Sequence, residues 1–268
     1  KAYPDRYFNV GIAEQNMVGM AAGVSSTGKV PFATTFAVFA AGRAFEVIRN
    51  SVCYPKANVK IAATHAGITV GPDGGSHQAI EDLALMSSLP NMIVLSPADD
   101  IEACKCVKAA AEVNSPVYLR FGRIPLDDIY TDKYDFQIGR GSELAKGDDV
   151  TIIATGIMVH KALKAAEELK DEGINARVIN MATIKPIDEE IIVKSAKETK
   201  GIVTVEEHSI IGGLGDRVSA VVCENHPTVV KKIGVKDVFG ESGNPDELLE
   251  KYGLTVENIK ETVRSIVK

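Results

Sequence analysis

The feature that most constrains this 268-residue chain is a regular alternation of short apolar runs with stretches of helical periodicity. Such alternation is typical of βαβ units, in which helices cover both faces of a mostly parallel sheet. The apolar runs form two blocks, and we expect each run to be a buried strand. They are residues 30–36, 58–64, 91–97 and 115–121 in the first block, and 150–155, 176–180, 202–207 and 229–235 in the second.

Each block has enough strands and helices for one domain. We therefore expect an α/β fold of two three-layer αβα domains with mostly parallel sheets, over residues 1–126 and 148–268. Residues 127–147 lie between them, are polar, carry turn signals and lack helical periodicity. We interpret this segment as an interdomain linker.

The composition excludes some classes of function. The formal net charge is −6, whereas a protein that binds a nucleic-acid backbone needs a basic face. No apolar stretch is long enough to span a bilayer, so we expect neither a nucleic acid nor a membrane as a partner. The cysteines form no CxxC pair and follow no signal-like stretch, which favours a reducing cytoplasm. We expect all four to be buried as small hydrophobic residues: Cys53, Cys104, Cys106 and Cys223.

A glycine-rich loop after the second predicted strand is the most informative segment for function. It holds His65, Asp73 and His77, and it lies where open α/β sheets usually bind ligands. These side chains could be metal ligands, acid–base groups, or contacts to hydroxyl and phosphate groups. A metal site is the weaker alternative, because the spacings do not match a compact ligand motif on one helix face.

Other candidate residues precede and follow this loop. Glu14 opens an otherwise apolar helix, where a carboxylate either caps the helix or has a partner. Phe36 and Phe39 could form an apolar slot for a heteroaromatic ring, or simply face the core. Arg120 and Arg123 lie just beyond a strand end, where a guanidinium could hold a phosphate.

The segment GGLGD, residues 212–216, superficially resembles a phosphate-binding turn because it follows a strand and opens a helix. It lacks the full GxGxxG pattern and the acidic residue of a dinucleotide site. We therefore assign it no ligand.

In order and spacing, several segments resemble the pyrimidine-binding domain of transketolases: RYFNVGIAEQNM, PFATTFAVF, THAGITVGPDGGSHQAIEDLALM and LRFGR. The later segments look like the C-terminal domain of the same family: VTIIATG, ARVINMATIKPID and IVTVEEHSIIGGLG. The resemblance covers essentially the whole chain and implies a transketolase C-terminal half.

The resemblance implies a thiamine diphosphate site. Glu14 would be the catalytic carboxylate that hydrogen-bonds the aminopyrimidine ring and so promotes deprotonation of the thiazolium carbon. Phe36 and Phe39 would pack around the pyrimidine ring.

The resemblance also implies sugar-phosphate substrates. Asp73 and His77 would bind donor hydroxyls, with His77 also acting in catalysis, and His65 with Arg123 would contact the phosphate. The implied reaction transfers a two-carbon ketol unit from a ketose phosphate, such as xylulose 5-phosphate, to an aldose phosphate. It is a ping-pong reaction through a covalent adduct of the cofactor.

Three departures from the family pattern qualify the resemblance. Gly42 stands where bacterial relatives often have a tyrosine, and Pro72 stands where an acidic residue commonly precedes the aspartate. The diphosphate-binding domain with its GDG…N motif does not occur. The sequence starts within the first βα region of the pyrimidine domain, so we expect its opening strand to be missing. We therefore expect an N-terminal half to bind the diphosphate and Mg²⁺, this chain itself holding no metal, in a homodimer of this chain or a heterotetramer.

Other functions stay open. The chain could resemble 1-deoxyxylulose-5-phosphate synthase or the beta chain of a 2-oxo acid dehydrogenase, both thiamine enzymes. It could also be a non-catalytic assembly subunit. The loop HAGITVGPDGGSHQ together with TTFAVF looks more like transketolase than like the other two thiamine enzymes. The intact set of Glu14, His65, Asp73 and His77 argues against a non-catalytic subunit.

Overall fold

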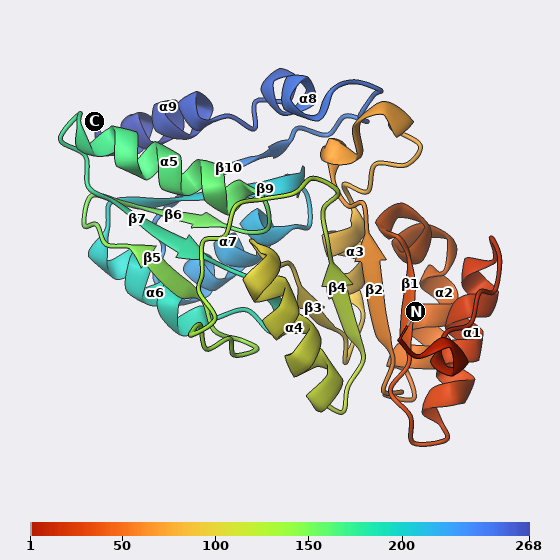
Figure 1. The fold of residues 1–268 in the computed structure, drawn as a ribbon. Coiled ribbons are helices and arrows are strands. Elements are labelled where there is room, and N and C mark those ends of the chain that lie inside the picture. The colour runs from red at the N-terminus through yellow and green to blue at the C-terminus, as the bar shows by residue number, and fades with distance from the viewer. Residues whose placement is uncertain (1) are drawn as a thin grey trace.

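The computed structural model describes residues 2–268 and contains two five-stranded sheets (Figure 1). The first has the strand order β1-β2-β4-β3-β8 and the second β10-β9-β6-β7-β5. All strand pairs are parallel except β3 with β8 and β5 with β7. The prediction of two mostly parallel α/β domains is confirmed.

All eight predicted strands are present. In the first sheet they are β1 (Phe32–Phe36), β2 (Lys60–Thr64), β3 (Ile93–Leu95) and β4 (Val117–Arg120). In the second they are β6 (Val150–Ala154), β7 (Ala176–Asn180), β9 (Gly201–Ser209) and β10 (Val229–Val235). Nearly every residue of the central strands is buried, as the continuous apolar runs require for a sheet covered on both faces.

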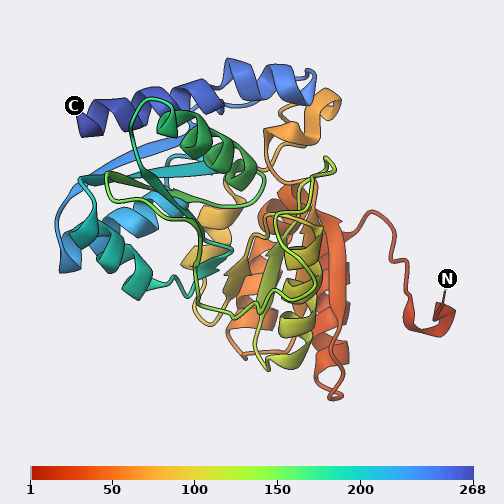
Figure 2. The same cartoon turned by 60° about the vertical axis from the view of Figure 1, so that its left-hand side comes forward.

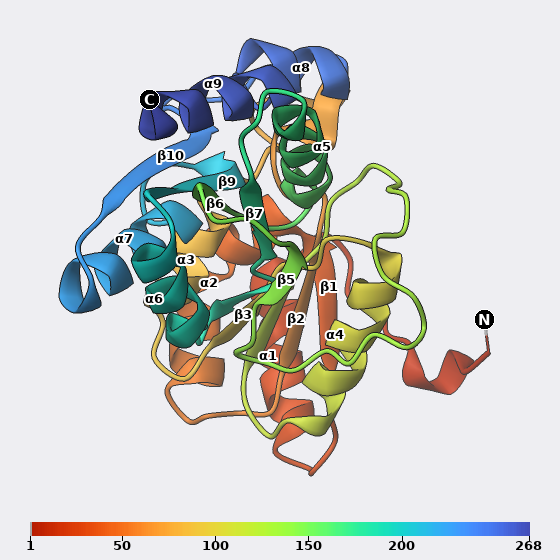
Figure 3. The same ribbon diagram turned by 90° about the vertical axis from the view of Figure 1, so that its left-hand side faces the viewer.

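Helices cover both faces of each sheet. On the first sheet, α4 (Asp100–Glu112) lies on one face, and α1 (Glu14–Ser25), α2 (Phe45–Val47) and α3 (Asp82–Ser88) lie on the other (Figure 1). On the second, α5 (Met158–Lys170) and α9 (Val256–Val267) lie opposite α6 (Glu189–Glu198) and α7 (Leu214–Asn225), while α8 (Pro245–Lys251) continues the α9 side towards the first domain (Figure 3). One hydrophobic cluster runs from α1 through both sheets to α7, so the two domains share a continuous core.

Two short strands were missed by the sequence analysis. β5 (Ser142–Ala145) lies inside the segment interpreted as a linker and pairs with β7. β8 (Thr183–Lys185) comes from the second block of sequence but pairs with β3 at the edge of the first sheet. The second half of the chain therefore contributes directly to the first sheet, and the exact domain boundaries stay a prediction.

The described N-terminal segment extends away from the first domain before α1 begins (Figure 2). It contains a short 3₁₀ helix, Pro4–Arg6, and several strongly exposed apolar side chains: Tyr3, Tyr7, Phe8 and Ile12. The cysteine prediction is half wrong. Cys53 and Cys106 are buried, whereas Cys104 and Cys223 are exposed on the outer sides of their helices.

Candidate active site

The Glu14 carboxylate is buried at the start of α1, with 6% of the residue exposed. Its Oε2 atom accepts a hydrogen bond from Arg43 Nη1 at 2.9 Å. Burial alone would raise the pKa of Glu14, but hydrogen bonding to its own backbone N–H and to Arg43 outweighs burial and lowers the pKa. The Glu14 carboxylate is therefore a buried anion paired with the half-exposed guanidinium of Arg43.

Arg43 is a site residue that the sequence analysis missed. It ends a π-helical turn, Phe39–Arg43, a geometry that is rare and frequent at functional sites. Its guanidinium lies 4.8 Å from the ring centroid of Phe39 while it pairs with Glu14. The spacing of four residues between a phenylalanine and an arginine in a helical segment was the available signal.

Four predicted residues collect in one aromatic cluster. The Phe36 and His65 rings stack at 4.0 Å between centroids, with 13° between their planes. Phe39 lies nearly parallel to Phe36 at 6.2 Å, and His77 meets the Phe39 ring edge-on at 5.4 Å. The cluster joins β1, the segment after it and both ends of the glycine-rich loop, so residues 36 to 77 converge on one surface.

His65 leads from β2 into this loop with a positive φ of 57°, which is uncommon for a non-glycine residue. Its Nδ1 lies 3.0 Å from Thr64 Oγ1. Burial and the nearby Arg123 lower the pKa of His65, although Asp73 opposes them. His65 is thus a neutral imidazole at pH 7.

Asp73 and Arg123 form the outer, more polar part of the site. Arg123 Nη1 donates to Asp73 Oδ2 at 2.9 Å and to the backbone oxygen of Val70. About two-fifths of each charged side chain is exposed, 39% for Arg123 and 40% for Asp73. These charged groups are therefore accessible to a polar ligand.

Arg120 does not lie with these residues. Its side chain is buried, with Nε 2.8 Å from Asp82 Oδ2 and Nη2 2.9 Å from the backbone oxygen of Glu207. Tyr118 donates its hydroxyl to the same Asp82 oxygen at 2.8 Å. The suggestion that Arg120 holds a phosphate is wrong, because the guanidinium is enclosed between the two domains.

The side chain of Glu206 occupies the turn at residues 212–216. Glu206 accepts hydrogen bonds from the backbone N–H groups of Leu214 at 2.7 Å and Gly215 at 2.8 Å. A Cβ at Gly213 would lie 2.1 Å from the same carboxylate. The helix N-terminus of α7 thus already has a carboxyl oxygen acceptor for its free N–H groups.

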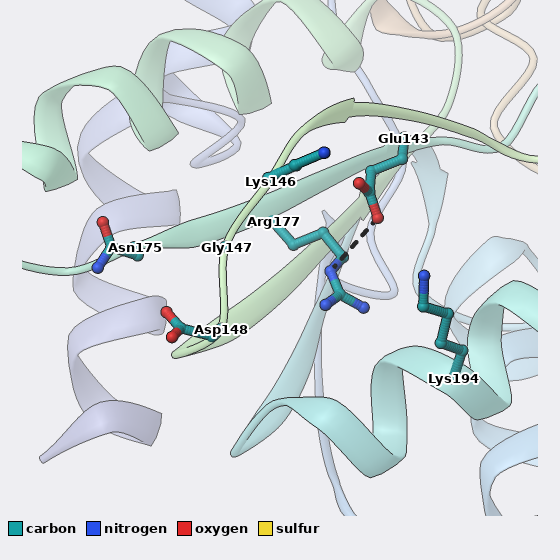
Figure 4. Close-up of a pocket in the computed structure, with 7 residues that line it drawn as sticks. All are labelled: Glu143, Lys146, Gly147, Asp148, Asn175, Arg177 and Lys194. Carbon is teal, nitrogen blue, oxygen red and sulfur yellow. Dashed lines mark ion pairs between the residues drawn. The ribbon is translucent and has the colours of Figure 1, made fainter.

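A shallow hollow on the second domain is separate from this site (Figure 4). It lies beside β5 and β7, where Arg177 and Glu143 form a loose ion pair at 3.6 Å, and Lys194 points in from α6. Opposite charges alternate around it. None of the residues predicted for the site contributes to it.

Residues 2–268 contain neither a metal-binding cluster nor a membrane-spanning helix. Within that range, no group of three or more His, Cys, Asp or Glu side chains is arranged to hold a metal ion. Over the same described residues, every helix is too short or too polar to cross a bilayer.

Known proteins similar to this chain identify its family. The transketolase pyrimidine-binding domain model matches residues 1–127, and the transketolase C-terminal domain model matches residues 139–259. A Methanocaldococcus jannaschii protein whose name assigns it as a transketolase C-terminal section is 52% identical, covering 100% of this chain and 85% of that protein. A 6-deoxy-6-sulfo-D-fructose transketolase subunit of a Clostridium species is 42% identical, covering 99% and 82%. A solved split gene transketolase, an inactive beta4 tetramer, has a TM-score of 0.94 and 58% identity, covering 99% of this chain and 86% of that one.

The fold and the matched models define a pyrimidine-binding domain followed by a transketolase-type C-terminal domain. The chain belongs to the transketolase family, a thiamine diphosphate-dependent family, and corresponds to its C-terminal section. The residues fit the ring end of that cofactor. A buried anionic carboxylate lies beside half-buried aromatic rings, which suits a flat heteroaromatic group with a polar nitrogen.

Proposed function

We propose that this chain supplies one side of a transketolase active site and acts together with an N-terminal half. The reaction is transfer of a two-carbon ketol group from a ketose phosphate to an aldose phosphate. The observation that carries the proposal is the convergence of a buried carboxylate, two phenylalanines, two histidines and an Asp–Arg pair on one surface.

Glu14, Phe36 and Phe39 are the proposed cofactor residues. Glu14, ionised at pH 7 with its lowered pKa, would accept a hydrogen bond from a protonated ring nitrogen of the cofactor. Phe36 and Phe39 offer apolar surface to the ring. Thiamine diphosphate, when bound, supplies the carbanion chemistry of the reaction. The diphosphate and Mg²⁺ are assigned to the N-terminal half.

The polar rim is the proposed substrate site. Asp73 and His77 bind sugar hydroxyls, with His77 next to the aromatic cluster where it can also hold or move a proton. Arg123 and the neutral imidazole of His65 bind the phosphate, since a guanidinium matches phosphate oxygens in charge and geometry. The accessible charge of Arg123 supports this assignment.

The exposed apolar groups support a protein partner. Ile12 is 93% exposed and Phe8 70% exposed on the extended N-terminal segment, and Met20 is exposed on α1, close in sequence to Glu14. Groups of this kind are usually covered in an assembly. A related split transketolase that forms a beta4 tetramer is inactive, which is consistent with a requirement for the other half in a dimeric or heterotetrameric enzyme.

The test is a ketol-transfer assay from xylulose 5-phosphate to ribose 5-phosphate with thiamine diphosphate and Mg²⁺. The chain is assayed alone, and then mixed with the N-terminal half encoded by the same organism. We expect activity only in the mixture. An inactive mixture that nevertheless forms a complex would contradict the proposal and favour a related thiamine enzyme or an assembly subunit.

A further inference from the structure

The glycine-rich loop that carries Asp73 and His77 is attached to the second domain at both ends. At its start, the backbone N–H of Thr69 donates to Glu207 Oε1 on β9 at 2.7 Å. At its end, the side-chain amide of Gln78 donates to the Glu241 backbone oxygen at 2.9 Å and to the Ile68 backbone oxygen at 3.0 Å. Gln78 therefore closes the loop on itself and ties it to the segment before α8.

The loop and this segment fit each other too closely for side chains larger than glycine. A Cβ at Gly240 would lie 1.7 Å from Gln78 Oε1, and one at Gly74 would lie 2.5 Å from Ser242 Oγ. A Cβ at Gly75 would lie 2.6 Å from the backbone oxygen of Gly240. Residues 240–243 of the second domain thus pack closely against the loop. This contact lies above the first sheet and beside α8 (Figure 1).

Gln78 contributes to this contact through its two donor bonds. The residue is only 3% exposed, and within residues 2–268 no donor reaches its Oε1 atom. A buried polar oxygen without a partner is unfavourable. The amide is held in place because its Nε2 atom joins two backbone oxygens, one on each side of the domain boundary.

We propose that Gln78 is a positioning residue, whose amide fixes the loop against the second domain and thereby orients the adjacent His77 and Asp73 toward the sugar. This role rests on the proposed function. It gives the second domain a part in substrate binding without contact to the substrate. Displacements of about 1 Å in positioning groups can reduce turnover by about 100-fold. Loss of the Gln78 hydrogen bonds should therefore have a measurable effect on the reaction.

Two variants test the role in the mixture of both halves. Gln78→Leu keeps the approximate size of the side chain and removes both donor N–H groups. Gly240→Ala leaves Gln78 unchanged but places a methyl group where its Oε1 atom lies. The control is Gln137→Leu, which alters an exposed amide in the 127–147 segment. For each protein, kcat and KM for xylulose 5-phosphate, the Kd for thiamine diphosphate and the melting temperature are measured.

We expect both variants to lower kcat/KM by about tenfold or more, mainly through KM for the sugar phosphate. Both variants should also lower the melting temperature, because Gln78→Leu leaves two backbone oxygens without their donor and Gly240→Ala displaces the Gln78 amide. Thiamine diphosphate affinity should stay close to wild type, and the control should match wild type throughout. Where Gln78→Leu fails to fold, Gly240→Ala decides the outcome.

The inference is overturned if kcat/KM of the folded variants stays within about twofold of wild type. It is equally overturned if thiamine diphosphate affinity falls together with sugar binding, because that pattern indicates a general structural role rather than the positioning of the sugar-binding loop. An inactive wild-type mixture contradicts the proposed function and the inference with it, whereas an active wild type with unaffected variants contradicts the inference alone.

Discussion

Among single residues, Glu14 and Arg43 form the pair on which the site depends. The guanidinium lowers the pKa of the carboxylate and at the same time binds its Oε2 atom and contacts the Phe39 ring. Half of the Arg43 side chain is exposed, so this interaction can rearrange when a ligand enters. Arg43 thus contributes to the lowered pKa of Glu14 in the absence of a cofactor.

The change Arg43→Ala should raise the pKa of Glu14 toward its ordinary value. In that variant, burial still raises the pKa, and mainly the hydrogen bond from the backbone N–H of Glu14 still lowers it. The measurement is a titration of the Glu14 carboxyl carbon by NMR in the isolated chain. Arg49→Ala, which removes an exposed arginine paired with Asn50, is the control and should leave that pKa unchanged. An unchanged Glu14 pKa in Arg43→Ala would show that Arg43 does not lower it.

Helices and strands were predictable where they combine a long apolar or periodic pattern with a recognisable end. Asp99 is the N-cap of α4 and accepts the backbone N–H of Glu102 at 2.7 Å, and aspartate is a residue type that commonly marks a helix start. β5 and β8 were missed because they have four and three residues and owe their extended form to pairing with β7 and β3. Local sequence carries little information on such tertiary pairing.

Asp99 also fixes the segment interpreted as a linker. Its Oδ2 atom accepts the backbone N–H groups of Ile129 at 2.7 Å and Tyr130 at 2.8 Å. Asp99→Ala should lower the free energy of unfolding by about 2 kcal/mol or more, since a helix cap is lost and two further donors lose their acceptor. The control Asp100→Ala, at the exposed neighbouring position, should lower the free energy of unfolding by less than about 1 kcal/mol. Urea unfolding monitored by circular dichroism measures both, and equal costs would contradict the assigned role.

In the whole molecule, the two domains are joined by buried charged groups as well as by the shared core. Glu207 on β9 accepts the Thr69 N–H, and its carboxylate fills the space beside Gly67, where a Cβ would lie 2.2 Å from Cδ. Arg120 on β4 and Asp82 on α3 complete this buried group. The sequence indicated several of the residues that the structure brings together, though not Arg43. The contact that holds the loop between the domains joins positions 138 residues apart and has no local signal.

This buried group should make stability depend on pH. Burial raises the pKa of Glu207 from 4.5 to about 7, although Arg120 and the Thr69 N–H oppose the rise. The folded state therefore holds the proton more tightly than the unfolded state. The stabilisation is complete below pH 4.5 and is lost as the pH rises to about 7.

In Glu207→Gln this position cannot titrate, so the variant does not lose the stability that wild type loses as the pH rises. The unfolding free energy of the variant minus that of wild type should therefore increase by up to about 3 kcal/mol between pH 4.5 and 7. Urea midpoints across this range measure the difference. The control Glu224→Gln, at an exposed position of α7, should track wild type. A constant difference between Glu207→Gln and wild type would show that Glu207 does not titrate in this range.

The central claim, that Glu14 activates the cofactor from this half of the enzyme, is tested most directly by proton exchange. In the complex of both halves with thiamine diphosphate and Mg²⁺, the rate at which the thiazolium C2 proton exchanges for deuterium is compared for wild type, Glu14→Gln and the exposed control Glu46→Gln. We predict that Glu14→Gln still binds the cofactor but slows exchange by about 10²-fold or more, while Glu46→Gln matches wild type. Wild-type exchange rates in a Glu14→Gln complex that has bound the cofactor would contradict the claim.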